Sequence, residues 1–217
     1  MTTYAEPYRS FEALLSEGDG SISREAITIA AGAGVLKAGT VIGKITTGTS
    51  ATSAATAGNA GNGTMGTITV SASALPGVYK LIIIEAATDA GTFQVEGPDG
   101  KIIGTGNVAA AFSKGGLAFT LADGSNDFAA GDSFSITVAA GSGKWTGYDD
   151  GNSNGSQVAL GVLMQAVDAS GSDDAKATAI VRLAEVKKDA LQWISAVDST
   201  AKAKAYTDLA LVNIIAR

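Results

Sequence analysis

The sequence predicts a mainly β protein, in which a β-rich α+β domain with a short C-terminal helix carries an inserted antiparallel β-sandwich of the immunoglobulin-like type. Three observations support this fold class. Short apolar segments with a period of two residues, typical of strands, recur along the chain. The chain has 28 glycines among 217 residues and only 17% charged residues, which favours strands and tight turns over long helices. The first strand pattern also stops at Thr46 and resumes only near residue 144, which indicates an insertion.

Two early segments show the strand period most clearly. In the first, Ile27 and Ile29 lie on one face. In the second, Val41 and Ile45 share a face and Ile42 lies on the other. This alternation predicts two strands, which the sequence Ala-Gly-Ala-Gly between them would join through a turn.

After the insertion the chain is expected to return to the first domain. Residues 157–166 and 177–186 are predicted to be strands. Asp198 or Ser199 can cap a helix, because the side-chain oxygen of either residue can accept a hydrogen bond from a free N–H group of the first turn. The face of this helix that we expect to be buried consists of Ala203, Tyr206, Leu209 and Ala210.

Residues 64–143 carry strands and turns of their own. Turn signals recur about every 8 to 15 residues, as in the sequence Pro-Asp-Gly at 98–100, and this spacing predicts a small antiparallel sandwich. The segment has three lysines and seven carboxylates, so it carries most of the net charge of −6 and is expected to face solvent. Its alternating apolar positions are Ile68, Val70, Phe93, Val95, Leu117, Phe119, Phe134, Ile136 and Val138.

Two segments lack a regular period. Residues 48–63 contain only small and polar side chains, and we expect a flexible linker there. Residues 1–20 form a polar N-terminal arm that carries a few large apolar groups. Such an arm is either a tail without partners or a segment that becomes ordered on the surface of a partner, with these groups as anchors. The candidate anchors are Tyr4, Pro7, Tyr8, Phe11 and Leu14.

The segments on either side of the insertion, taken in order, resemble a known family, the tailed-phage head decoration proteins of the lambda D type. The match is tighter in the N-terminal part, which ends with the sequence Leu-Lys-Ala-Gly-Thr-Val-Ile-Gly-Lys-Ile, than in the C-terminal part. The resemblance covers roughly residues 14–46 and 144–217, and residues 47–143 lie outside it. The matching segments are 15–25, 27–30, 36–45, 148–149, 158–163, 179–186, 208–210 and 214–217.

This resemblance implies a discontinuous decoration-protein domain made of residues 21–47 and 144–217. It implies a viral structural protein that binds the major capsid protein on the outer surface of a phage head, does so as a homotrimer, and stabilises the expanded head. Residues 1–20, with the anchors named above, would then be a capsid-binding arm. The protein would be made in the host cytoplasm and located in the virion.

Composition argues against several other functions. The chain contains neither cysteine nor histidine, which excludes disulfides and removes the commonest general base and metal ligand. The net charge of −6 argues against a nucleic-acid partner, because phosphate binding needs clustered Lys and Arg. No apolar run approaches the roughly 18 residues of a membrane span, and the N-terminus lacks the pattern of a signal peptide. We therefore expect no enzymatic activity, no cofactor, no metal site and no membrane partner.

Two short motifs suggest ligands but are incomplete. Residues 141–144, Gly-Ser-Gly-Lys, lack both the first glycine of a phosphate-binding loop and the Ser or Thr after its lysine. Residues 150–155, Asp-Gly-Asn-Ser-Asn-Gly, match the first half of a calcium-binding loop, but its twelfth position is Gly161 in place of glutamate. A polar turn is the simpler interpretation of the second motif, and weak calcium binding by it stays open.

Two other classes of function also stay open. A surface adhesin or carbohydrate-binding module would use the sandwich to recognise its ligand, and glycan binding by residues 64–139 alone would identify it. A hydrolase would show activity in a catalytic screen, although the missing histidine and cysteine argue against one. Within the decoration-protein interpretation, the insertion could contact a host-cell surface.

Overall fold

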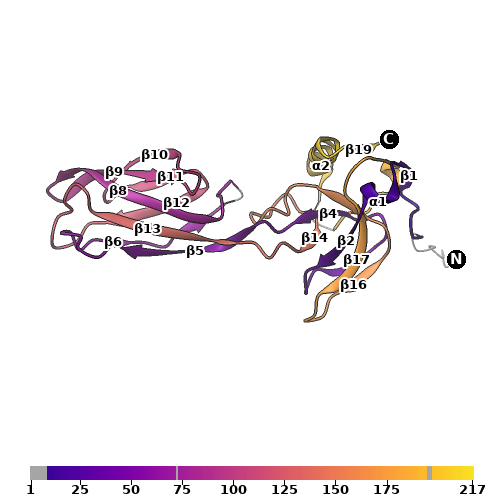
Figure 1. Ribbon diagram of the computed structural model, residues 1–217, viewed down its shortest axis with the longest axis horizontal. Coiled ribbons are helices and arrows are strands. Elements are labelled where there is room, and N and C mark those ends of the chain that lie inside the picture. Colours follow the sequence, from indigo (N-terminus) through magenta and orange to yellow (C-terminus); the bar gives the residue numbers. More distant parts are fainter. Residues whose placement is uncertain (1–8, 72, 195–196) are drawn as a thin grey trace. The chain divides into compact units, whose positions relative to one another are not determined.

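The computed structural model describes residues 9–71, 73–194 and 197–217 (Figure 1). The chain divides into two compact units. Unit 1 consists of Met1–Ile45 and Gly143–Arg217, and unit 2 consists of Thr46–Ser142. The fold is mainly β, as the sequence predicts, with several antiparallel sheets and one longer helix near the C-terminus.

Unit 1 is built on a closed barrel of five short strands. In barrel order these are β14 (Trp145–Gly147), β2 (Arg24–Ile29), β17 (Ala175–Ile180), β15 (Gly161–Leu163) and β4 (Val41–Lys44). All neighbouring pairs are antiparallel except β14 and β2, which are parallel. Each of these strands has a paired neighbour on both sides, and β2 and β14 meet only at Ile29 and Trp145.

The two faces of the barrel strands contribute to two hydrophobic clusters. Ile42 packs with Ile27 and Ile29 in one cluster, and its neighbour Val41 belongs to a second cluster that includes the C-terminal helix. Val41 and Ile42 are 1% and 0% exposed, so both faces of β4 are buried. The alternation expected from the sequence is therefore present. It does not separate a core face from a solvent face, because the two faces of the strand point into two different hydrophobic clusters.

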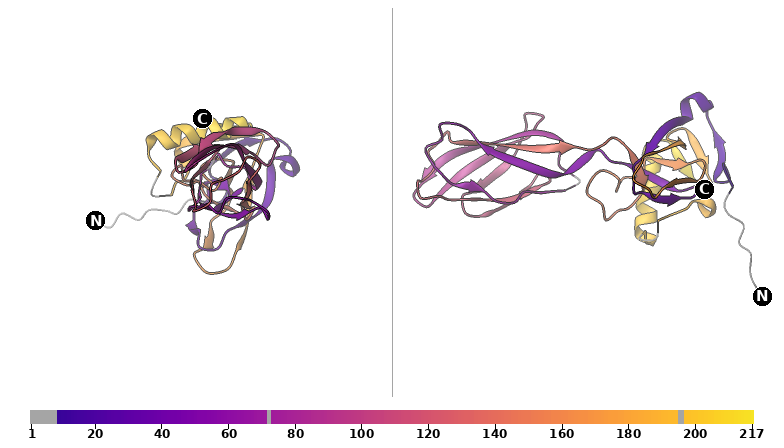
Figure 2. Two further views of the ribbon diagram at one scale, coloured as in Figure 1. Left: turned by 90° about the vertical axis from the view of Figure 1, so that its left-hand side faces the viewer. Right: turned by 90° about the horizontal axis from the view of Figure 1, so that it is seen from below.

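The remaining elements of unit 1 surround this barrel. A three-stranded sheet has the order β1 (Leu14–Glu17), β18 (Ala184–Val186) and β19 (Ile214–Ala216), and β3 (Gly34–Leu36) pairs with β16 (Val167–Ala169). Figures 1 and 2 show α2 (Ser199–Leu211) along one side of the unit. The short helices are α1 (Gly20–Ser23) and the 3₁₀ turn η1 (Lys188–Ala190).

Helix α2 begins as predicted but buries a different face. The Asp198 carboxylate accepts a hydrogen bond from the N–H of Ala201 (2.8 Å) and so caps the first turn. The buried positions are Ala201, Ala205 and Leu209, whereas Ala203 and Ala210, expected to be buried, are exposed. The spacing of four residues places Ala201 and Ala205 on one face of the helix, against the barrel. Because these side chains are small, the helix lies close enough for Tyr148 Oη to donate a hydrogen bond to the carbonyl of Ala201 (3.0 Å).

The strands predicted over 157–166 and 177–186 are shorter than expected. The first is limited to the three residues of β15. The second divides into β17 and β18, which belong to different sheets. Leu183 lies between them with a φ of +52°, and this left-handed residue turns the chain from the barrel into the outer sheet.

Unit 2 is an antiparallel sandwich. Its larger sheet has the order β10 (Ile102–Asn107), β9 (Ala90–Glu96), β8 (Gly77–Ala87), β13 (Ser133–Ala140) and β5 (Thr47–Ala55). In the smaller sheet, β12 (Leu117–Ala122) pairs with β11 (Ala111–Lys114), β6 (Thr64–Met65) and β7 (Thr69–Val70). Both sheets contribute to one apolar cluster, which contains the rings of Phe93, Phe112 and Phe119.

The segment 48–63 differs from the flexible linker expected there. Strand β5 occupies its first half and pairs with β13, and an edge strand of this kind needs no large side chain because its backbone forms the ladder. The second half is held by side chains. Asn59 Oδ1 accepts from the N–H of Ser133 (3.0 Å) and its Nδ2 donates to the carbonyl of Ser133 (2.9 Å).

The two ends of unit 2 lie side by side. Thr47 pairs with Ala140, and the N–H of Gly141 donates to the carbonyl of Thr46 (3.0 Å). An insertion whose ends meet in this way closes the host chain over a short distance. Among the helices formed by described residues, none is both long and apolar enough to cross a bilayer.

Candidate functional site

The candidate capsid-binding residues of the sequence lie at the start of unit 1. Tyr4, Pro7 and Tyr8 fall outside the described residues, whereas Phe11 and Leu14 are described. The predicted arm over 1–20 is not free along its whole length, because β1 pairs antiparallel with β18. Leu14 lies opposite Val186 in this ladder, so residues 14–17 are an integral part of unit 1.

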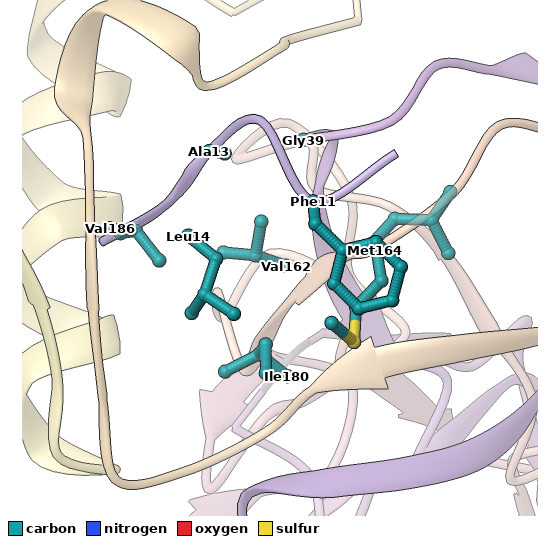
Figure 3. A pocket seen from close by; sticks show the side chains of 9 residues that line it. Phe11, Ala13, Leu14, Gly39, Val162, Met164, Ile180 and Val186 are labelled. Carbon is teal, nitrogen blue, oxygen red and sulfur yellow. The ribbon is translucent and has the colours of Figure 1, made fainter. Parts of the chain in front are cut away.

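A small apolar pocket lies beneath this N-terminal segment (Figure 3). Phe11, Ala13 and Leu14 contribute to it from the segment itself, and residues of the barrel region and of β18 form the remainder. Among the described residues that line the pocket, none contributes a side-chain nitrogen or oxygen, so these residues offer packing and no acid–base group. The lining residues are Phe11, Ala13, Leu14, Gly39, Val162, Leu163, Met164, Ile180 and Val186.

Phe11 and Leu14 have different surroundings. Leu14 is half-buried against the hydrophobic cluster of unit 1, and Ala13 beside it is 5% exposed. The Phe11 side chain is 45% exposed. The segment is thus fixed at Ala13 and Leu14, and it presents Phe11 at the surface.

The backbone at Phe11 adopts a conformation that is unusual for a bulky residue. Its φ is +67°, in the left-handed region. Two hydrogen bonds hold this turn: the Phe11 N–H donates to the carbonyl of Met164 (2.9 Å), and the Phe11 carbonyl accepts from the N–H of Leu14 (3.0 Å). Strained residues of this kind persist where surrounding contacts determine them, and they are frequent at functional sites.

An ion pair lies beside the exposed ring. The Arg24 guanidinium carbon is 5.1 Å from the centroid of Phe11. Arg24 Nε donates to both carboxylate oxygens of Glu17 (3.0 Å each), and Arg24 Nη2 also contacts Glu17. The hydrogen bonds from Arg24 and then Ser23 hold the pKa of Glu17 below its usual value. Arg24 therefore stays oriented over the ring by a partner on β1.

Further exposed apolar side chains occur in the same region. Leu15, Ile22 and Leu183 are 52%, 49% and 44% exposed. The segments that carry them are joined by hydrogen bonds: the N–H of Gly18 donates to the carbonyl of Leu183 (2.8 Å), and Arg182 Nη1 donates to the carbonyl of Ile22 (2.8 Å). These three side chains and Phe11 are thus exposed apolar groups carried by segments of unit 1 near its N-terminal strand.

Arg24 and Met164 are neighbours of Phe11 that the sequence patterns do not predict. Arg24 could have been suspected from the Glu17–Arg24 charge pair that flanks the predicted first strand. Met164 gives no local signal, because it is about 150 residues away in the sequence and meets Phe11 only through the fold.

The partial calcium motif at 150–155 forms a polar turn. Asn154 Oδ1 accepts from both the N–H and the hydroxyl of Ser156 (3.1 and 2.7 Å). Asn152 Nδ2 donates to the same hydroxyl (2.9 Å). These side chains are therefore used to stabilise the turn, as in other Asx motifs.

Tyr148 is the most shielded titratable side chain of this region, and its surroundings are structural. It is 0% exposed, and its hydroxyl donates to the backbone of α2. Burial, together with nearby carboxylates of which Asp150 contributes most, raises the pKa of Tyr148 to about 12. The phenol therefore stays protonated as a hydrogen-bond donor.

Comparison with solved structures gives weak likenesses to flagellar proteins. FlgL of Xanthomonas campestris is 23% identical over 46% of this chain and 33% of its own, with a TM-score of 0.34. FlgL from Legionella pneumophila is 21% identical over 47% and 37%, with a TM-score of 0.33. The hook junction protein FlgK from Burkholderia pseudomallei is 19% identical over 57% and 21%, with a TM-score of 0.34. At these TM-scores the likenesses carry no argument. No curated protein matches the chain.

The family comparison is decisive, because it spans nearly the whole sequence. Residues 3–214 match the model of bacteriophage lambda head decoration protein D. This agrees with the resemblance of the segments that form unit 1. Proteins of this family are structural proteins of the phage head that bind the capsid. The chain belongs to the family of the bacteriophage lambda head decoration protein D.

Proposed function

We propose that the chain binds the major capsid protein on the outer surface of a phage head, as a homotrimer, and stabilises the expanded head. The family match over residues 3–214 is the observation that carries this proposal. The exposed apolar side chains near the start of unit 1 support it, because an exposed ring such as that of Phe11, with the Arg24 guanidinium beside it, suits contact with another protein.

We assign the capsid contact to the N-terminal segment. Tyr4, Pro7, Tyr8 and Phe11 would provide the contact side chains, and Leu14 would attach the segment to unit 1. The exposure of Phe11 and the partial burial of Leu14 support this division. Aromatic side chains are frequent energetic anchors in interfaces, because they bury a large area with few rotatable bonds.

A trimer would present three such segments at once. Once one segment is bound, the others encounter their sites at a high effective concentration, so overall affinity can exceed that of a single segment by orders of magnitude. Such a trimer would stabilise the head by linking neighbouring capsid subunits, since binding only the expanded form shifts the equilibrium toward that form.

We further propose that residues 21–47 and 144–217 fold as a host domain and that residues 64–143, with the strand that precedes them, fold as a separate domain. The adjacent ends of unit 2 and the separate hydrophobic clusters of the two units support this organisation. Unit 2 carries an excess of carboxylates, which favours exposure to solvent, and it could contact a host-cell surface.

Binding to two forms of the head tests this function. The full-length protein would be mixed with expanded heads and with procapsids of the phage that encodes it, and co-sedimentation would measure the bound fraction. We expect binding to expanded heads alone, and a higher disruption temperature of the heads that carry the protein. Equal binding to both forms, or no change in head stability, would refute the stabilising role.

The assignment to the N-terminal segment needs a separate measurement. A variant that lacks residues 1–8 leaves every described element intact and should lose most of its affinity for expanded heads. Sedimentation equilibrium of the same variant provides the control, because its oligomeric state should equal that of the full chain. Undiminished binding by the truncated protein would exclude the proposed contact.

A further inference from the structure

The two edges of the larger sheet in unit 2 differ in how they are protected. An edge strand presents unpaired N–H and C=O groups to any other strand, and native proteins guard such edges with charges, bulges or short length. At one edge, the register of β10 shifts between Ile102 and Gly104, and Lys114 Nζ donates to the carbonyl of Thr105 (3.2 Å). This edge is therefore interrupted, and a cation occupies one of its carbonyls.

The opposite edge, formed by β5, is long, regular and uncharged. Strand β5 spans nine residues, Thr47–Ala55, and contains neither a charged residue nor a proline. Its register against β13 is regular from Ala51 to Ala55, and the last four of these residues are all exposed. Figure 1 shows β5 along one margin of the sandwich. An edge of this kind is open to pairing with another strand.

The end of β5 is also uncovered on the face that belongs to the core. Ser53 lies opposite Ile136 and Ala55 lies opposite Phe134 in the ladder, and directly opposed residues point to the same face of a sheet. Ile136 and Phe134 are buried in the sandwich, whereas Ser53 and Ala55 are exposed. The core face therefore continues to the edge without side chains that cover it, and an added strand would extend that face.

The part of the chain that carries β5 contains no charge. Residues 45–79, which include β5, β6 and β7, contain no Asp, Glu, Lys or Arg. The charged residues of unit 2 all lie in residues 80–132, and these three lysines and seven carboxylates give a net charge of −4. Two copies of the chain therefore repel each other when their later strands approach, whereas no charge on β5 opposes contact between two β5 edges.

We propose that β5 pairs, edge to edge and antiparallel, with β5 of a second copy of this chain. The same edge occurs on both copies, so one contact satisfies both, and the sheet continues from one copy into the other. A two-fold contact of this kind cannot be part of a three-fold trimer, so it would link neighbouring trimers. That last step alone rests on the proposed function.

The contact is expected to be weak between free molecules. One strand from each copy provides less area than the interfaces of stable complexes. Copies held side by side on one phage head would meet at a high effective concentration, which raises the paired fraction without any new contact. A covalent trap is therefore a better test than an equilibrium measurement.

The absence of cysteine from the chain allows single-cysteine variants to report this contact. Cysteine would be placed at each position of 49–55 in the full-length protein, and disulfide-linked dimers would be followed by non-reducing electrophoresis under mild oxidation. The position at the two-fold centre lies within disulfide reach of its own copy, so we expect it to crosslink about tenfold faster than Thr137→Cys. Thr137 is the matched control, because it lies opposite Thr52 on β13 and is likewise exposed.

Two outcomes of this scan would overturn the proposal: no position that reacts faster than Thr137→Cys, or equal rates at all positions. A lysine placed two residues from the fastest cysteine tests the pairing again, because like charges then meet across the edge and crosslinking should fall about fivefold. An unchanged rate in a variant that melts like the wild type would also contradict it. Since no phage head is used, these results do not depend on capsid binding.

Another occupant of the edge would be detected on phage heads. Thr52→Cys would be labelled with a maleimide–benzophenone, bound to expanded heads and irradiated, with Thr137→Cys as the control. A photoproduct with the mass of two chains, specific to Thr52→Cys, is expected. A product that joins the chain to a different protein, without the two-chain product, would show that the edge accepts another partner and would overturn the assignment to a second copy.

Discussion

The buried carboxylate of Asp132 holds the segment after β5 against the rest of unit 2, and its replacement by alanine should destabilise this unit alone. Asp132 is 6% exposed. Its oxygens accept hydrogen bonds from the backbone N–H groups of Ala60 (2.9 Å), Gly61 (2.8 Å) and Ala129 (3.0 Å). One side chain thus fixes two loops that are about 70 residues apart in the sequence.

The size of the effect follows from these three donors. A hydrogen bond to a charged group contributes about 1.5–3 kcal/mol, but water can replace part of each bond here because Ala60 is exposed and Gly61 and Ala129 are half-buried. We therefore expect Asp132→Ala to reduce the free energy of unfolding of unit 2 by about 2–4 kcal/mol. For a domain of about 100 residues this corresponds to a fall of roughly 10 °C or more in melting temperature.

The positions of the tryptophans allow the two units to be followed separately. Trp145 and Trp193 both belong to unit 1, so their fluorescence in urea reports that unit, whereas far-UV circular dichroism reports both. Asp132→Ala should shift the dichroism transition of unit 2 and leave the fluorescence transition in place. The exposed variant Glu85→Ala is the control and should change neither. A shift below about 0.5 kcal/mol for Asp132→Ala, or a fluorescence transition that moves with it, would refute the reasoning.

The same residue predicts a dependence on pH. Burial alone would raise the pKa of Asp132, but the three N–H donors outweigh it, so the pKa lies below its usual value. A carboxyl with a lowered pKa in the folded state contributes stability that is fully present above its unfolded pKa, near 3.9. This contribution is lost as the pH falls below about 4 and through the folded pKa. Asp132→Ala should therefore reduce the loss of unit 2 stability in acid.

Unit 1 can be tested in three further ways. Tyr148→Phe removes a buried hydroxyl that donates to α2 and should cost about 1 kcal/mol in urea denaturation followed by tryptophan fluorescence; no change would contradict the assigned bond. Phe11→Ala should weaken binding to expanded heads in co-sedimentation while the melting temperature stays within a few degrees of the wild type. Replacing residues 46–142 by a short Gly-Ser loop should leave unit 1 folded by circular dichroism, since Ile45 and Lys144 remain hydrogen-bonded (2.8 Å), and an unfolded product would show that the units share one core.

Local patterns were sufficient for several elements. The alternation at Ile27, Ile29 and Val41 predicts strands correctly, because side-chain direction alternates in a strand whatever its partners are. Asp198 likewise marks the start of α2, since capping depends on groups within one turn. The buried face of that helix could not be read in the same way, because it depends on which residues allow close contact with the barrel.

The structure of segment 48–63, by contrast, could not be predicted from local patterns. Its small residues carry no signal for a strand, and composition alone predicts a linker. Its structure comes from β13, which provides the ladder for β5 and is more than 75 residues away, and from the carboxylate of Asp132. A segment whose order is supplied by distant partners resembles a flexible one in sequence, because the stabilising groups are not in the segment itself.

Local patterns predict only part of the structure of the N-terminal segment, and the rest depends on distant partners. This structure bears on how capsid binding should be tested. In sequence, Phe11 and Leu14 are equivalent, as large apolar residues on a polar arm. The fold separates them, because the ladder between β1 and β18 draws Leu14 inward while the left-handed turn at Phe11 leaves the ring exposed. Ala13 is also buried in unit 1, so a deletion that reached it would remove part of the core as well as the proposed contact. Loss of binding after such a deletion would have two explanations, whereas removal of residues 1–8 or the single change Phe11→Ala separates contact from stability.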